Sequence, residues 1–215
     1  MSMIIYKCVV CGKDFQRKSA RKSKGRYCSR ICYKNRIIRK TNIENDIVFI
    51  SLTKDKVAML DKIDADLSNF NWLANHNITK ANENWYAGRR VGNKHEHMHR
   101  VILERILGRL LYRHEDVDHI NNNGLDNRRL NLRVATRSEN MQNKRKSGCM
   151  NGKNTTSAYK GVNWHKSSSK WISRIRLNGV RKFLGYFKNE KEAAMAYNQA
   201  AKEFFGEFAQ LNEVV

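Results

Sequence analysis

A carboxylate, an imidazole and several carboxamides lie close together between Val117 and Asn140. Asp118 and Asn140 offer oxygen atoms, the donors that Mg²⁺ and Mn²⁺ take in proteins while they keep several water molecules. His119 belongs to the residue type that titrates near neutrality, so its imidazole is a natural base for a water molecule that attacks phosphorus. A metal ion would stabilise the charge that develops on the phosphate and on its leaving oxygen. These residue types therefore predict hydrolysis of a phosphodiester.

The elements around these residues are expected to bring them together. Apolar residues on either side of a long polar turn, at Val117 and from Leu130 to Val134, indicate two strands joined by a loop. Thr136 and Glu139 have the spacing of a capping box, which marks the start of a helix. Asn140 would lie in the first turn of that helix and turn back toward the strand end. The expected order is strand, loop, strand, helix.

The segment from Met98 to Lys146 resembles the HNH endonucleases of phages and of intron-borne homing elements. The resemblance implies that Asp118 is a metal ligand, His119 the general base, Asn131 a brace for the loop and Asn140 the second metal ligand. Many members of the family have His at the last position. A neutral oxygen donor there favours Mg²⁺ or Mn²⁺ over zinc. The alternative is that Asp and Asn merely build turns, but turns do not require His119 or Asn140.

The composition indicates a polyanionic partner. The 215 residues include 42 Lys and Arg against 20 Asp and Glu, which gives a formal charge of +22. Such an excess favours nucleic acid through counterion release. Together with the HNH resemblance, which implies DNA, we expect double-stranded DNA as the partner and no small-molecule substrate. An anionic membrane surface is the competing interpretation, but no apolar run has the length of a membrane span and no signal peptide is visible. We expect a soluble, cytoplasmic protein without a membrane partner, encoded by a phage or mobile element.

Four of the five cysteines form two close pairs, Cys8-x-x-Cys11 and Cys28-x-x-x-Cys32. Pairs at this spacing can place four thiolates around a tetrahedral zinc ion, whereas an intracellular chain has little use for disulfides. The segment resembles the treble-clef or zinc-ribbon fingers found beside phage nucleases. We expect a structural Zn²⁺ that supplies folding energy. Reduced thiols without a metal are the alternative.

Between these segments the sequence gives coarser signals. Strands are expected near Asp46–Leu52 and at Asn84–Ala87, closed by Gly88, with a short helix or turn from Leu60 to Leu67. Apolar residues at helical spacing predict a helix from Met98 to Leu110, which would support the catalytic hairpin. Three histidines alternate just before this helix and at its start: His95, His97 and His99. They are interpreted as part of a surface strand and not as a metal site. His99 is expected to touch the catalytic centre.

A second compact region comes after a polar stretch that has no periodicity and is interpreted as a linker. Three strands are expected, at 159–164, 170–177 and 181–187. Asn178–Gly179 is a strong signal for a tight hairpin, and Asn189–Phe205 has the pattern of a helix. On the middle strand Arg174 and Arg176 share one face, opposite the apolar face.

This region resembles the Apetala/ethylene-response-factor (ERF) DNA-binding domain through Tyr159-x-Gly161-Val162, Phe183-Leu184-Gly185-x-Phe187 and Ala193-Ala194-x-Ala196-Tyr197. Arginines on an exposed sheet face suit the major groove, where Arg binds guanine through two hydrogen bonds. The resemblance implies DNA contacts at Lys160, Asn163, His165, Arg174, Arg176, Arg181 and Phe183. Several of the family's arginines are replaced here, so its base preference is not transferred. The alternative is a structural sheet with solvated charges.

The sequence thus predicts a modular α+β protein. We expect a zinc-binding finger at 1–42, a ββα-metal HNH endonuclease domain with packing elements at 43–146, a linker at 147–156 and an Apetala/ERF-type DNA-binding domain at 157–215. The predicted activity is site-specific, divalent-metal-dependent DNA cleavage of the homing type. One catalytic hairpin per chain predicts a monomer that nicks one strand. The alternative is a non-catalytic DNA-binding transcription regulator that has retained an HNH fold.

Overall fold

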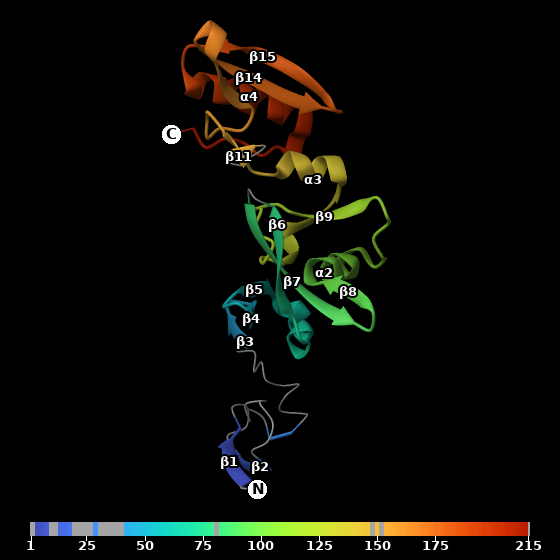
Figure 1. Ribbon diagram of the computed structural model, residues 1–215. Coiled ribbons are helices and arrows are strands. Elements are labelled where there is room, and N and C mark those ends of the chain that lie inside the picture. Colours follow the sequence, from blue (N-terminus) through green and yellow to red (C-terminus); the bar gives the residue numbers. More distant parts are fainter. Residues whose placement is uncertain are drawn as a thin grey trace.

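The computed structural model describes residues 3–8, 13–18, 28–29, 41–79, 82–146, 149–150 and 153–214. Figure 1 shows three groups of elements along the molecule: an N-terminal hairpin in blue, a central group in cyan to yellow, and a C-terminal sheet and helix in orange to red. Helices and several small antiparallel sheets are both present, which confirms the α+β class. No helix in the described part of the chain is long and apolar enough to cross a membrane.

Two strands form the N-terminal hairpin, β1 (Met3–Lys7) and β2 (Asp14–Lys18). They pair antiparallel, and the backbone N–H of Cys8 donates to the carbonyl of Lys13 at 2.9 Å. Cys8 is buried and Cys28 is partly exposed. Cys11 and Cys32 lie outside the described residues, so the zinc finger stays a prediction.

The central group begins with two three-stranded antiparallel sheets. The first contains β3 (Thr41–Glu44), β4 (Ile47–Ser51) and β5 (Val57–Asp61), and the second contains β6 (Leu73–Thr79), β7 (Asn82–Val91) and β8 (Lys94–His97). A 3₁₀ helix, η1 (Lys62–Asn69), connects them, and α2 (Met98–Leu107) comes directly after β8. The strand expected near Asp46–Leu52 and the helix expected from Met98 are therefore confirmed, although α2 ends at Leu107.

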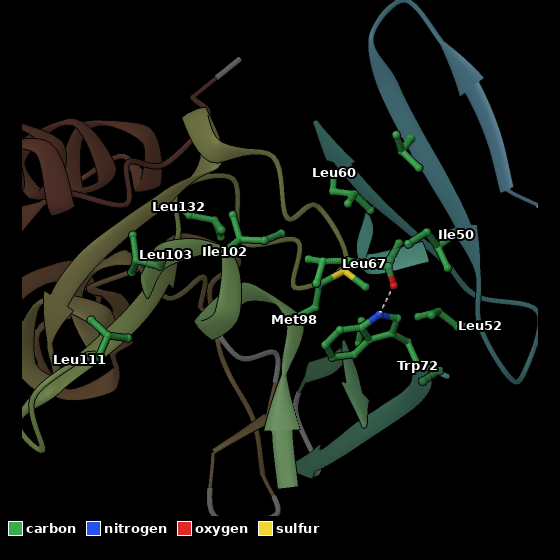
Figure 2. Close-up of a cluster of buried hydrophobic side chains, with 14 residues drawn as sticks. Ile50, Leu52, Leu60, Leu67, Trp72, Met98, Ile102, Leu103, Leu111 and Leu132 are labelled. Carbon is green, nitrogen blue, oxygen red and sulfur yellow. Dashed lines mark hydrogen bonds between the residues drawn. The ribbon is translucent and has the colours of Figure 1, made fainter. Parts of the chain in front are cut away.

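The apolar residues of these elements form one core, shown in Figure 2. Val48 and Ile50 alternate toward it from β4, while Met98 and Ile102 reach it from α2 one turn apart. Trp72 is fully buried, and its indole N–H donates to the carbonyl of Leu67 at 2.8 Å. The core thus holds α2 against both sheets.

Two predicted boundaries in this region are wrong. Leu60 belongs to β5, and the helical segment starts two residues later at Lys62. Gly88 does not close a strand, because β7 continues through it to Val91. A Cβ atom at this glycine would overlap the side chains of Asn75 and His95. Gly88 therefore lets these side chains approach the backbone of β7 closely, and it does not form a turn.

The candidate catalytic segment has the predicted order of elements: β9 (Glu115–His119), a polar loop ending in η2 (Arg129–Asn131), β10 (Leu132–Thr136) and α3 (Arg137–Asn143). The two strands pair antiparallel, with Asp118 opposite Arg133 and His119 opposite Leu132. The capping box is present, since the hydroxyl of Thr136 accepts from the N–H of Glu139 and that carboxylate accepts from the N–H of Thr136. Leu132 is part of the core, which fixes the hairpin to α2.

The segment predicted as a linker contains a short antiparallel pair, β11 (Cys149–Met150) and β12 (Lys153–Asn154). The C-terminal sheet comes next, with β13 (Val162–His165), η3 (Lys166–Ser168), β14 (Lys170–Leu177) and β15 (Val180–Phe187), and then α4 (Glu190–Phe205) and η4 (Gly206–Phe208). Asn178 and Gly179 both have positive φ, 49° and 80°, as the predicted tight hairpin turn requires.

The two faces of this sheet differ as predicted. Ile175 and Leu177 of β14 pack with Tyr197 and Ala201 of α4, and the small alanines let the helix lie close to the sheet. Leu184 interrupts the pairing register of β14 and β15 as a bulge and packs into the same core. Arg174 and Arg176 alternate with these apolar residues along β14 and belong to the opposite face.

Candidate active site

Asp118 lies near the end of β9, and its side chain is buried at 3% exposure. One carboxylate oxygen, Oδ2, accepts from Nε of Arg133 at 2.8 Å. Nδ2 of Asn143 lies within hydrogen-bond distance of both oxygens, 3.0 Å from Oδ1 and 3.1 Å from Oδ2. Removing a charge from water is costly unless partners compensate it, and here a cation and an amide do so.

The helix α3 brings two carboxamides to β9. Asn140, the predicted second metal ligand, donates to the carbonyl of Val117 at 3.5 Å. Asn143 is the one that contacts Asp118, and it also donates to the carbonyl of His119 at 2.9 Å. Asn143 was not among the residues predicted from the sequence. The sequence contained a signal for Asn143, because it lies three residues after Asn140 on the helix that begins after Thr136. Residues three apart on a helix share a face.

His119 is buried next to Asp118, and its Nε2 atom has no hydrogen-bond partner among the described residues. Burial lowers the pKa of this imidazole to about 4, against Asn127 and the charge of Asp118, which raise it. The ring is therefore neutral near pH 7. A neutral imidazole with an unpaired nitrogen has a lone pair that can accept a proton.

Asn131 ties the two ends of the loop together. Its Oδ1 accepts from the backbone N–H of Asn121 at 3.0 Å, and its Nδ2 donates to the carbonyl of Asp126 at 2.7 Å. Asp126 in turn accepts from the side chains of Asn121 and Arg128. Through these bonds Asn131 connects Asn121 with Asp126 in the loop that follows His119.

A row of aromatic rings leads away from His119. The ring of His99 lies 5.1 Å from that of His119 and 5.1 Å from that of His97, and Tyr86 lies 5.9 Å from His119. His95 and His97 belong to the predicted strand, β8, whereas His99 is in α2 and does reach the catalytic centre. Burial, and then the charges of His119 and His97, lower the pKa of His99.

Beside this row is a pocket of about 310 Å³, lined by Tyr86, His97, His99, Arg100, Asp116, Val117 and Asn140. Two of the histidines present buried Nδ1 atoms that have no hydrogen-bond partner among the described residues, His97 and His99. Asn140 lines the same pocket.

The donors around Asp118 fit a hard divalent cation. Asp118 offers the carboxylate oxygens, while Asn143 turns its Nδ2 toward them. Mg²⁺ typically takes one or two carboxylates and fills its remaining positions with water and substrate phosphate. In the described part of the chain, no group of three or more His, Cys, Asp or Glu side chains is placed to hold a metal ion. Any cation here would thus depend on Asp118, the neighbouring amides and the substrate itself.

The predicted DNA-facing residues of the C-terminal sheet gather mostly on one face. Pairing puts Arg174 opposite Phe183 and Arg176 opposite Arg181, so these four share the face away from α4. Phe183 is 55% exposed and packs edge to face on Tyr186. Two further positions are on β13: Asn163 is exposed, and His165 is partly buried with Nδ1 2.8 Å from the hydroxyl of Ser168.

Lys160 is placed differently from the rest of that set. Its ammonium donates to the carbonyls of Gln142 and Lys144 at the end of α3, at 2.5 and 2.7 Å. Burial lowers the pKa of this amine to about 8. Lys146 makes the reverse connection, from the segment after α3 to the carbonyls of Tyr159 and Val162. These lysines join the catalytic segment to the C-terminal sheet.

Comparison with known proteins agrees with this geometry. Residues 96–142 match the family model described as HNH endonuclease, so the chain contains an HNH endonuclease domain. It is also 33% identical over 120 residues to an uncharacterized HNH endonuclease of Acanthamoeba polyphaga mimivirus, across 56% of this chain and 57% of that protein. The family model and this relative are both described as HNH endonucleases.

The chain is also similar to plant proteins over a shorter stretch. Dehydration-responsive element-binding protein 2D of Arabidopsis thaliana is 41% identical over 73 residues, which cover 31% of this chain and 35% of that protein. Protein 2A of Oryza sativa subsp. indica is 41% identical over the same length, across 26% of its own chain. The chain thus has partial similarity to Apetala/ERF DNA-binding proteins, and it spans 57% of the mimivirus relative and about a third or less of these plant relatives. No solved structure matches it.

Proposed function

We propose that this protein is a site-specific, divalent-metal-dependent DNA endonuclease of the homing type. The observation that carries the proposal is the pair at the end of β9, a buried neutral imidazole with an open Nε2 on His119 beside the carboxylate of Asp118. A purely DNA-binding surface has no use for a buried base of this kind. One such pair per chain supports a monomer that nicks one strand of double-stranded DNA.

Each residue of the site has a distinct role in the proposed hydrolysis. Asp118 and Asn140 would hold Mg²⁺ or Mn²⁺, and that ion stabilises the charge of the scissile phosphate when bound. His119 takes at Nε2 the proton of the attacking water. Asn131 keeps the loop in place. Asn143 holds the carboxylate of Asp118 and the backbone carbonyl of His119 together through hydrogen bonds to both.

The accessory parts would choose the target. Residues 157–215 are proposed to read the major groove with the arginine-bearing face of the sheet, and residues 147–156 to link them to the nuclease domain at 43–146. The relatives named for binding a DNA element support this role. The mimivirus relative supports a viral or mobile-element origin, and we propose that the protein acts in the cytoplasm.

The test is cleavage of a supercoiled plasmid carrying the target, with and without Mg²⁺. His119→Ala should lower the nicking rate by about a hundredfold or more, the contribution typical of a general base, while DNA affinity in a gel-shift assay stays unchanged. His114→Ala is the matched control, because this histidine is exposed on the approach to the same strand. Parental nicking rates in the His119 variant would refute the mechanism.

The second candidate is a DNA-binding transcription regulator without catalysis, favoured by the similarity to the plant proteins. It predicts tight binding to a specific duplex and an intact plasmid with every divalent cation tried. The same plasmid assay therefore separates the two candidates.

For the N-terminal segment we propose one structural Zn²⁺ held by Cys8, Cys11, Cys28 and Cys32. The hairpin that ends at the buried Cys8 supports a knuckle at this position. Elemental analysis should find one zinc per chain, and Cys28→Ser should release it. Cys149→Ser is the control because this residue lies outside the two pairs. Protein purified without chelators that contains no zinc would exclude the site.

A further inference from the structure

The C-terminal unit touches the catalytic hairpin close to Asp118, through the segment 207–210. Nη1 of Arg133 donates to the carbonyl of Glu207 at 2.8 Å, and its guanidinium carbon lies 3.8 Å from the ring centroid of Phe208. In the adjoining loop, Nδ2 of Asn122 donates to Oε1 of Gln210 at 2.7 Å. These residues are far apart in the sequence, so the contacts depend on how the two units pack.

The other edge of the same guanidinium meets the candidate metal ligand. Nε of Arg133 donates to Oδ2 of Asp118, and Nη2 lies 2.8 Å from the same oxygen. The side chain of Arg133 is only 12% exposed. One arginine thus connects Phe208 of the C-terminal unit with the carboxylate at the catalytic centre.

The two oxygens of Asp118 are used unequally. Oδ2 receives the guanidinium and the amide of Asn143, whereas Oδ1 receives only that amide among the described residues. A carboxylate oxygen has two acceptor positions. Oδ1 therefore keeps one position free for a further partner, and the guanidinium determines which oxygen that is.

We infer that Phe208 and Arg133 are positioning residues of the nuclease. Phe208 holds the guanidinium from one side, and the guanidinium turns Asp118 so that Oδ1 is the oxygen offered to a divalent cation. The inference rests on the proposed function. In this arrangement the C-terminal unit is a structural part of the catalytic site as well as a DNA-binding unit. The competing explanation is that this contact only attaches one unit to the other.

Substitutions at Phe208 separate these explanations. Phe208→Leu keeps apolar packing but removes the aromatic face, whereas Phe208→Trp keeps the face. The Leu variant should raise the Mg²⁺ concentration for half-maximal nicking about tenfold, in line with a cation–π contact, with unchanged target affinity. The Trp variant should restore the parental value. Phe183→Leu, on the exposed sheet face, should instead weaken target binding and leave the Mg²⁺ requirement unchanged.

Two measurements without DNA make the test independent of cleavage. The Nε–H signal of Arg133 in ¹H–¹⁵N NMR should shift in Phe208→Leu and return in Phe208→Trp. Mn²⁺ binding followed by electron paramagnetic resonance should weaken about tenfold in Phe208→Leu, by the same cation–π estimate, with Asp118→Asn as the reference for the lost site. Arg133→Lys keeps the charge without the planar fork and should weaken Mn²⁺ binding as well.

The outcomes separate the two proposals. Mn²⁺ binding that depends on Phe208 in a protein that never nicks DNA would support the positioning role and overturn the nuclease. Nicking by the parental protein, together with unchanged Mn²⁺ binding and an unmoved Arg133 signal in Phe208→Leu, would overturn the positioning role alone. A folded Phe208→Leu variant, checked by thermal unfolding, is required for either conclusion, and Arg133→Lys gives the same decision if it does not fold.

Discussion

The central unit and the C-terminal unit put their polar groups in different places. In the central unit the buried polar side chains are Asp64, Asp118, His119, Asp126, Asn127, Asn131 and Asn143, most of them around the catalytic loop. In the C-terminal unit they are two serines, Ser157 and Ser173, while Trp164, Phe183 and Tyr186 are exposed. The central unit thus buries most of these polar side chains, whereas the C-terminal unit exposes aromatic side chains on its surface.

This difference matches what each unit is proposed to do. A base and a metal ligand work when they are fixed and shielded from water, and fixing them requires buried partners. Reading a groove requires side chains that can reach out of the protein. Substitutions should therefore cost stability in the central unit and affinity in the C-terminal unit.

The largest effect on stability is expected at Asp64, which is fully buried and accepts from Nη1 of Arg105 at 3.0 Å and from Nε of Arg129 at 2.8 Å. Asp64→Asn should lower the free energy of unfolding by about 3 kcal/mol, because breaking a buried pair leaves charge uncompensated. Urea unfolding measures it. Asp46→Asn is the control, since that carboxylate is 81% exposed beside Lys62 and its loss should cost less than about 0.5 kcal/mol. If both variants lost the same free energy of unfolding, burial of the carboxylate would not explain the cost.

In the C-terminal unit, replacing Arg174 and Arg176 together with Ala should weaken target binding about tenfold or more, since each specific base contact is worth about 1–3 kcal/mol. Unfolding should change by less than about 0.5 kcal/mol, as for other surface substitutions. The control removes two cations from α4 instead, Lys191→Ala with Lys202→Ala. If both double variants lose the same affinity, charge alone explains binding and the arginine face reads no bases.

The smallest effect is expected at Glu115 in the central unit. Glu115 begins β9 with its side chain 12% exposed, and its hydrogen bonds with Arg109 lower the pKa of its carboxyl from 4.5 to about 2. Because the folded pKa is the lower one, this contribution to stability is complete above pH 4.5 and is lost as the pH falls toward 2. Glu115→Gln should therefore have a lower Tm than the parental protein at pH 7, and the two should converge near pH 2. A Tm difference that persists at that pH would assign the effect to packing.

The catalytic hairpin was predictable because its signals are local. Alternating apolar residues, a polar turn and the pair Thr136 and Glu139 each act over a few positions, and the structure confirms the order of elements. Asn143 was missed because the family pattern drew attention to Asn140 one turn earlier. The boundary at Gly88 failed because glycine was interpreted as a strand end, whereas packing across the sheet requires it there.

Other features could not be predicted from local patterns. Arg133 meets Glu207 across 74 positions in the sequence, and Lys160 meets Gln142 across 18. The alternation of apolar and polar residues along a strand does not indicate which carbonyl of another unit a lysine will contact. The face of the sheet was therefore predictable, while the residues that turn toward α3 required the tertiary structure.

The position of Lys160 has a consequence for protein engineering. The last carbonyls of a helix need donors from outside it, and here the C-terminal unit supplies them to the segment that ends α3. Replacing the C-terminal unit with an unrelated DNA-binding domain would remove those donors. A chimera that retains Lys160, together with the carbonyls of Tyr159 and Val162 that receive Lys146, should keep the graft point intact while the sheet beyond it is exchanged.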